Sequence, residues 1–249
     1  MKKDTSWEDA AGWYDSYLKS GATYQSEVIW PNVRRLLQVK ARQKIADIGC
    51  GSGFFSGLLS GEGAEVFGVD ASASLITAAR KNVPGGSFIV ADATKTSAKA
   101  NSFDAAILIN SLENMENPAA VLKETARILK DSGRMLLVIN HPAFRIPGAS
   151  SWGFDKKSGV QYRRLDSYLS ERKVKFLLHP SKKNSPYTIN YHRPLQSYFK
   201  MLKNAGFVAA TIEEWVSHKK SRPGSRALAE NVARKEFPLF LALLAIKAK

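Results

Sequence analysis

Apolar positions in the first half of the chain form short runs that alternate with stretches of helical periodicity. The runs have the length and composition of buried strands, and the stretches between them place apolar residues three and four positions apart. The predicted strands are 44–48, 65–69, 87–91, 103–109 and 134–140, and the predicted helices are 53–60, 72–82 and 118–130. Because strands alternate with helices, we expect a parallel sheet with right-handed crossovers.

Two further apolar runs lie late in the chain, at Phe207 to about Trp215 and at Phe240 to Ile246. A predicted helix that begins near Leu195 precedes them. With these runs the sheet would have seven strands and carry an antiparallel hairpin at one edge. The pattern therefore predicts a doubly wound α/β fold in a single domain over residues 1–249, with a seven-stranded, Rossmann-like, mostly parallel sheet whose last strand is antiparallel.

Two segments depart from the alternation. Residues 1–40 are rich in aromatic residues and predict two helices joined near Gly21, which would form an N-terminal helical cap over a ligand or pack on the sheet edge. Residues 141–193 are interrupted by Pro and Gly and predict an inserted substrate lid, in which 162–179 pairs with 186–191 as a hairpin. Aromatic residues of this lid would wall an acceptor pocket or form its own small core: Trp152, Phe154, Tyr162, Tyr168, Phe176, Tyr187 and Tyr191.

The strongest local motif follows the first predicted strand, where residues 47–53 read Asp-Ile-Gly-Cys-Gly-Ser-Gly. The three glycines allow positive φ and let a ligand lie against the backbone, near the free amides of the next helix. Asp70 and Asp92 follow the second and third predicted strands. An acid about twenty residues after a glycine turn is where a doubly wound fold binds a ribose. Capping of a helix or turn is the alternative role for both acids.

With this turn, the two acids and the Leu129-to-Gly133 turn in place, the sequence resembles the class I S-adenosylmethionine-dependent methyltransferases over residues 25–140. More narrowly, it resembles the branch related to ubiquinone and menaquinone biosynthesis. The resemblance implies S-adenosylmethionine as the cofactor. The cofactor-binding residues that it implies are Asp47, Gly49, Cys50, Gly51, Gly53, Asp70, Ala71, Asp92, Ala93 and Asn110.

The resemblance also implies a role for each matched position. The glycine turn would pass under the methionine and ribose, and Asp47 would orient the ammonium group. Asp70 would accept hydrogen bonds from the ribose hydroxyls, Asp92 would contact the adenine amine, and Asn110 would lie near the methyl group. A Rossmann dehydrogenase is the competing interpretation, since it also has an acid after the second strand. Its third glycine or alanine falls one place later, here at Phe54, which disfavours it.

His141 and His192 are the candidate catalytic residues. One follows the fifth predicted strand and the other precedes the next core helix, so both would flank the edge where the methyl is presented. A general base contributes about 10²–10⁴-fold when the acceptor is a hydroxyl. A structural histidine is the alternative for each. Residues 110–113 lack the Asn/Asp-Pro-Pro-aromatic motif, and Cys50 is the only cysteine, so methylation of base amines and the covalent pyrimidine route are disfavoured.

Charge is concentrated in the second half of the chain. Residues 141–235 contain 19 Lys and Arg against six Asp and Glu, a net charge of +13 out of +15 for the whole chain. Such a region attracts nucleic acid, anionic lipid or an acidic substrate, or is simply a solvated surface. The chain shows no apolar run of the roughly 18 residues of a membrane span and no secretory leader, and with a single cysteine it predicts a cytoplasmic protein without a metal site.

These observations predict an enzyme that moves a methyl group from S-adenosylmethionine to oxygen, nitrogen or carbon of a small acceptor, aromatic or anionic. One alternative is an RNA methyltransferase that uses the basic region 141–235. Another is a catalytically silent subunit that binds the cofactor and supports a partner. The sequence does not specify the oligomeric state.

Overall fold

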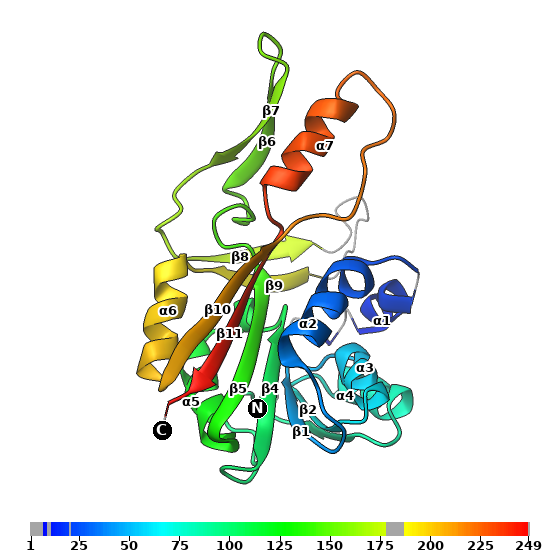
Figure 1. The fold of residues 1–249 in the computed structure, drawn as a ribbon, viewed down its shortest axis with the longest axis vertical. Coiled ribbons are helices and arrows are strands. Elements are labelled where there is room, and N and C mark those ends of the chain that lie inside the picture. Colours follow the sequence, from blue (N-terminus) through cyan, green and yellow to red (C-terminus); the bar gives the residue numbers. More distant parts are fainter. Residues whose placement is uncertain (1–6, 9–10, 20, 178–186, 249) are drawn as a thin grey trace.

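The computed structural model describes residues 7–8, 11–19, 21–177 and 187–248, and its centre is a seven-stranded sheet (Figure 1). The strand order is β10-β11-β5-β4-β1-β2-β3. The strands are β1 (Lys44–Ile48), β2 (Glu65–Asp70), β3 (Ser87–Val90), β4 (Phe103–Ile109), β5 (Leu129–Asn140), β10 (Phe207–Trp215) and β11 (Phe240–Lys247). The pairs from β5 to β3 are parallel, whereas β11 is antiparallel to β5 and β10. The predicted fold class is confirmed.

Helices cover both faces of this sheet (Figure 1). They are α2 (Trp30–Leu37), α3 (Phe54–Gly61), α4 (Ala73–Asn82), α5 (Pro118–Ile128) and α6 (Leu195–Asn204). One apolar core lies against α2 and α3, and the other lies against α5 and α6. Strand β1 contributes Ile45 to the first core and Ala46 and Ile48 to the second. A strand buried on both faces has a continuous apolar sequence, which is why its bounds could be predicted.

Strand β5 begins earlier than the sequence predicts. The predicted helix 118–130 ends at Ile128, and Leu129 already pairs with Phe103 of β4. The next aligned pair joins Arg134 to Ala105, so the intervening residues bulge out of the ladder. Ser132 in this bulge has a φ of +59°. The predicted turn is therefore a bulge inside the strand, fixed by pairing with β4 that local sequence does not specify.

The N-terminal segment contains the expected helices. Helix α1 spans Ala11–Lys19, and a π-helical turn over Gln25–Ile29 continues directly into α2. Gly21, with a φ of +114°, lies at the junction between α1 and this turn. Helix α1 packs beside α4, near the carboxyl end of β2 (Figure 1). This location brings the N-terminal segment close to the glycine turn.

The inserted segment contains two hairpins instead of one. Strands β6 (Ser150–Asp155) and β7 (Val160–Leu165) form the first, and β8 (Arg172–Leu177) pairs with β9 (Tyr187–His192) in the second. The predicted pairing is correct for the second hairpin and wrong for residues 162–165. The reason is the turn after Asp155, whose carboxylate accepts hydrogen bonds from the amide of Lys157 and the hydroxyl of Ser158. The predicted hairpin also included residues 178, 179 and 186, which lie outside the described residues.

The first hairpin packs against helix α7 (Ala227–Glu236), and together with the segment 219–226 they form what we call the hairpin lobe (Figure 1). The ring centroid of Trp152 in β6 lies 5.4 Å from that of Phe237, which directly follows α7. The guanidinium of Arg226 lies 4.7 Å from the ring centroid of Phe154. These aromatic residues of the insertion therefore stabilise the lobe.

Candidate functional site

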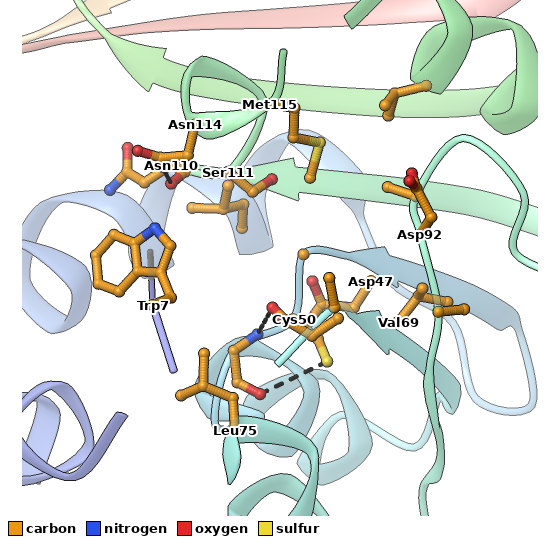
Figure 2. Close-up of a pocket in the computed structure, with 18 of the residues that line it drawn as sticks. Trp7, Asp47, Cys50, Val69, Leu75, Asp92, Asn110, Ser111, Asn114 and Met115 are labelled. Carbon is orange, nitrogen blue, oxygen red and sulfur yellow. Dashed lines mark hydrogen bonds between the residues drawn. The ribbon is translucent and has the colours of Figure 1, made fainter. Parts of the chain in front are cut away.

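A cavity of about 380 Å³ opens where the carboxyl ends of β1, β2, β3 and β4 meet (Figure 2). Nine of the ten predicted cofactor-binding residues line it. They are Asp47, Gly49, Cys50, Gly51, Asp70, Ala71, Asp92, Ala93 and Asn110. Gly53 is not among the lining residues. The carboxyl edge of a parallel sheet is the usual ligand position in open α/β folds.

The glycine turn lies tightly against the end of β4. Gly49 has a φ of +77°, and a Cβ built on it would lie 2.5 Å from the Cβ of Ser111. The hydroxyl of Ser111 donates a 2.9 Å hydrogen bond to the carbonyl of Ile48, which joins the two strand ends. A Cβ added at Gly53 would instead lie 3.2 Å from Cα of Ala79 in α4. The role of Gly53 is to let α3 and α4 pack closely, which explains its absence from the cavity wall.

The carboxylate of Asp70 closes the glycine turn from the β2 side. Its Oδ2 accepts a 3.0 Å bond from the amide of Gly51, and its Oδ1 accepts a 2.9 Å bond from the amide of Ser72. Burial raises the pKa of Asp70, and these amide hydrogen bonds oppose that rise. Each carboxylate oxygen has two lone pairs. Asp70 can therefore hold the turn and still accept hydrogen bonds from hydroxyl groups of a ligand in the cavity.

Two polar groups make the cavity wall near β1 and β4 suited to a cation. Asp47 is 2% exposed, and its Oδ2 accepts a 2.7 Å bond from the hydroxyl of Ser56. Burial raises the pKa of Asp47 to about 7, and the charge of Asp70 adds to this rise. The Oδ1 of Asn110 is buried without a hydrogen-bond partner among the described residues. A positively charged donor would satisfy both acceptors.

Asp92 follows β3, and Figure 2 shows it across the cavity from Trp7. Its Oδ1 accepts bonds from the amide and the hydroxyl of Thr94, at 2.9 and 2.8 Å. These bonds fix the turn that carries Ala91 and Ala93 along the cavity wall. Asp92 thus has a turn-capping role, and it also lies at the ligand cavity.

The sequence does not single out most of the lining residues from the N-terminal segment and the second hairpin. Trp7 and Leu18 come from the first, and Lys173, Ile189 and Tyr191 come from the second. Only Tyr191 belongs to the aromatic set predicted to wall the pocket. These residues belong to no local motif, because distant parts of the chain bring them to the cavity.

His141 and His192 do not belong to the described residues that line the cavity. His141 is 5% exposed; its Nε2 bonds Glu214 at 2.7 Å, and its Nδ1 accepts from the amides of Ala143 and Phe144 at 3.2 and 3.3 Å. Both ring nitrogens are therefore occupied. Burial lowers the pKa of His141, and Glu214 opposes this shift. The geometry fits a histidine that joins β5 to β10.

His192 has a comparable structural environment. Its Nε2 donates a 2.7 Å bond to the carbonyl of Tyr168, and the ring is 4% exposed. Burial lowers the pKa of His192. The bond joins the end of β9 to the segment that precedes β8. A catalytic role for either histidine stays a prediction, and the hydrogen bonds described here favour the structural alternative.

We expect His141→Ala to lower the free energy of unfolding by about 1–2 kcal/mol, because it leaves buried amides without their acceptor. Cofactor affinity should stay within about twofold of the unchanged chain, a small effect on the scale of binding free energies. Urea denaturation and calorimetry measure the two quantities. Loss of cofactor binding in a variant that remains folded would contradict this structural assignment.

Comparison with known proteins agrees with this architecture. Residues 46–137 match the family model described as a methyltransferase domain. A solved S-adenosylmethionine-dependent methyltransferase from Mesorhizobium loti is 26% identical, with a TM-score of 0.69 over 92% of this chain and 99% of that one. A solved (4+2)-cyclase shares the fold at 16% identity, with a TM-score of 0.62 over 100% of this chain and 98% of that one. Over residues 46–137 the chain is therefore similar to methyltransferase domains, and its fold is similar to that of a solved S-adenosylmethionine-dependent methyltransferase.

The curated relatives that match part of the chain include proteins named as demethylmenaquinone methyltransferases and as ubiquinone biosynthesis O-methyltransferases. A demethylmenaquinone methyltransferase of Paenarthrobacter aurescens is 31% identical over 142 residues, which is 55% of each chain. A ubiquinone biosynthesis O-methyltransferase of Xanthomonas oryzae is 31% identical over 116 residues, 43% of this chain and 48% of the relative. The chain thus spans about half the length of the curated relatives it matches. In the part of the chain that the structure describes, no helix is long and apolar enough to cross a membrane.

Proposed function

We propose that this chain is an enzyme that transfers a methyl group from S-adenosylmethionine to a small-molecule acceptor. The observation that supports this most strongly is the cavity itself, which gathers the glycine turn, Asp70, Asp92 and the acceptor atoms of Asp47 and Asn110. These groups come from the ends of four strands, β1, β2, β3 and β4. Their convergence on one space is what a ligand with an ammonium group, ribose hydroxyls and an adenine ring requires.

The bound cofactor would supply an electrophilic methyl group on a sulfonium. The residues of this chain fit such a ligand: Asp47 and Asn110 would accept hydrogen bonds from its ammonium group, and Asp70 would accept them from its ribose hydroxyls. Asp92 and the backbone of Ala93 would border the adenine. The protein's contribution to the rate would be positioning and exclusion of water, and positioning alone can account for several kcal/mol of a barrier.

Affinity for the cofactor should rise with pH. Because the pKa of Asp47 is about 7, its carboxyl is partly protonated in the free protein near neutral pH. A cationic ligand favours the carboxylate, so binding releases a proton, and affinity increases as pH approaches 7 and then levels off. We expect about a tenfold gain from pH 6 to 8. Calorimetric titrations across this range measure it.

Asp47→Asn is the control for this pH dependence. It keeps an acceptor for the hydroxyl of Ser56 but has no proton to release. The variant should bind more weakly at pH 8 and show a nearly flat pH profile. If the pH dependence of cofactor affinity were unchanged in this variant, a group other than Asp47 would be responsible for it.

For the acceptor we propose an aromatic compound of the quinol or phenol class. The described residues that line the cavity include Trp7, Met115, Ile189 and Tyr191, which suit a planar apolar ring. The names of the curated relatives point to the same class. Two of these residues come from the second hairpin, so we propose that β8 and β9 form the part of the predicted 141–193 lid that covers the acceptor.

We do not propose RNA as the acceptor. Much of the basic region lies in the hairpin lobe, and of its described cationic side chains only Lys173 lines the cavity. The motif of base-amine methyltransferases is also lacking at residues 110–113. The basic charge therefore needs a separate explanation from the site of methyl transfer.

The experiment that tests the proposed function has two parts. Calorimetry with S-adenosylmethionine tests binding, and turnover with methyl-labelled cofactor against a panel of quinols, catechols and phenols tests transfer. We expect binding together with a labelled product from at least one aromatic acceptor. Binding without any transfer would favour a silent cofactor-binding subunit, and absence of binding would overturn both proposals.

A further inference from the structure

A second hollow lies in the hairpin lobe and is lined by the 219–226 segment and helix α7. Its volume is about 580 Å³, and the described residues that line it are all different from those of the cavity above. Five cationic side chains line the hollow, and Glu230 is the one acidic residue among its described lining residues. The cations are Lys219, Lys220, Arg222, Arg226 and Arg234.

These five cations have no carboxylate partner among the residues that the structure describes. Among the described residues none of them forms an ion pair within 4.0 Å, although other cations of the chain do. Two of them instead lie on aromatic rings: Lys219 is 4.8 Å from the ring centroid of Tyr24, and Arg226 lies over Phe154. Like charges gathered in one hollow repel one another, and an anion relieves that repulsion.

The hollow is also held in shape by the protein. The amide of Ser221 donates a 2.8 Å bond to Oδ1 of Asn231, and Nε of Arg234 donates a 3.2 Å bond to the hydroxyl of Ser221. These two bonds fasten the basic segment to α7. The cations therefore lie on a surface that is already ordered. This order reduces the conformational entropy that the protein loses when a ligand binds.

We propose that this hollow is a second binding site, for a phosphate-bearing ligand with at least two negative charges. Three of its five cations are arginines, whose planar forks suit bidentate contacts with phosphate oxygens. The excess of positive charge matches a multiply charged anion better than a single carboxylate. None of the described residues that line the hollow is aromatic, so it lacks the stacking platforms typical of single-stranded RNA sites.

The phosphate can belong to a free molecule or to a lipid headgroup, because both present the same oxygens. An apolar surface lies on the same helix, since Leu228 is 80% and Val232 is 54% exposed. Exposed aliphatic side chains beside basic ones are also found where proteins contact anionic bilayers. The experiment described next distinguishes a free phosphate compound from a lipid headgroup.

The test compares Lys220→Ala/Arg222→Ala with a matched control, Lys156→Ala/Lys157→Ala. Both variants remove two exposed positive charges from the hairpin lobe, but Lys156 and Lys157 do not line the hollow. Binding of inorganic pyrophosphate is measured by calorimetry at constant ionic strength. Cosedimentation with phosphatidic acid–phosphatidylcholine vesicles, whose phosphomonoester headgroup can carry two negative charges, and with phosphatidylcholine alone, tests the lipid source. A short RNA oligonucleotide is the third probe.

We expect pyrophosphate, anionic vesicles or both to bind, with about a tenfold loss in Lys220→Ala/Arg222→Ala and less than about twofold in the control. Pyrophosphate binding alone identifies a free ligand, and binding to anionic vesicles identifies a lipid headgroup. Equal losses of phosphate-probe binding in both variants would overturn the proposal, because such losses would depend only on the net charge of the protein. Binding of neither phosphate probe, or of RNA only, would also overturn it. Cofactor binding should be unchanged in both variants.

Discussion

Gly49→Ala is expected to lower the free energy of unfolding by about 3 kcal/mol or more and to abolish measurable cofactor binding. At a φ of +77° an added Cβ is strained by about 1–2 kcal/mol. The same Cβ would lie 2.5 Å from Cβ and 3.0 Å from Oγ of Ser111, and 3.1 Å from Cε of Met115. Ser111 is held by its bond to Ile48, so relief of the clash would break the contact between β1 and β4.

Gly85→Ala is the matched control for this variant. A Cβ at Gly85 meets no described atom within 4 Å, and its φ lies outside the left-handed region. It should leave stability within about 0.5 kcal/mol of the unchanged chain, as for most surface substitutions. Urea denaturation gives the stability, and calorimetry gives the affinity. Normal cofactor binding by Gly49→Ala would show that the turn does not need to approach β4 this closely.

The sheet could be predicted because each of its strands is marked by a pattern of neighbouring residues in the sequence. Strands β1 and β4 have the predicted bounds, since a strand buried on both faces is apolar throughout. Asp47 and Asp70 could be singled out because they lie at the ends of two predicted strands, with the glycine turn directly after the first of them. Ser72 is the N-cap of α4, and its hydroxyl accepts a bond from the amide of Leu75.

The inserted segment could not be predicted to the same degree because its structure depends on distant contacts. The sequence contains the turn after Asp155 but does not show that Trp152 and Phe154 pack against residues more than sixty positions later. Aromatic composition alone therefore does not tell which of the predicted aromatic residues reach the cavity. Of that set, Tyr191 is the one among the described lining residues. The same limit applies to the histidines, since the partner of His141 is Glu214, on another strand.

The positive charge of the second half of the chain lies in two separate regions of the structure. The β8–β9 hairpin reaches the cavity with the lining cation Lys173, which lies 3.6 Å from Glu116. The hairpin lobe contains the five cations that line the second hollow. Net charge along the sequence does not distinguish these regions. Their separation in space allows the proposed methyl-transfer site and the proposed phosphate site to be tested independently.

Asp70→Ala should weaken cofactor binding by about 1–3 kcal/mol, which corresponds to about 5- to 150-fold. Its carboxylate accepts bonds from the amides of Gly51 and Ser72, and in the proposed complex it also accepts bonds from the ribose hydroxyls. Removing it leaves buried donors without an acceptor on both the protein and the ligand. Calorimetry with S-adenosylmethionine measures the combined loss, whereas 2′,3′-dideoxyadenosine, which lacks the ribose hydroxyls, should lose affinity only through the unpaired amides of the protein.

Asp104→Ala is the matched control for Asp70→Ala. Asp104 also accepts a backbone bond, from the amide of Lys44 at 2.8 Å, and a further bond from Nζ of Lys130 at 2.6 Å. It lies at the start of β4, at the opposite end of the sheet from the cavity. Its loss should reduce stability without changing affinity for either ligand. If Asp70→Ala bound both ligands normally, or if both variants lost affinity equally, the assignment of Asp70 to the ribose would be wrong.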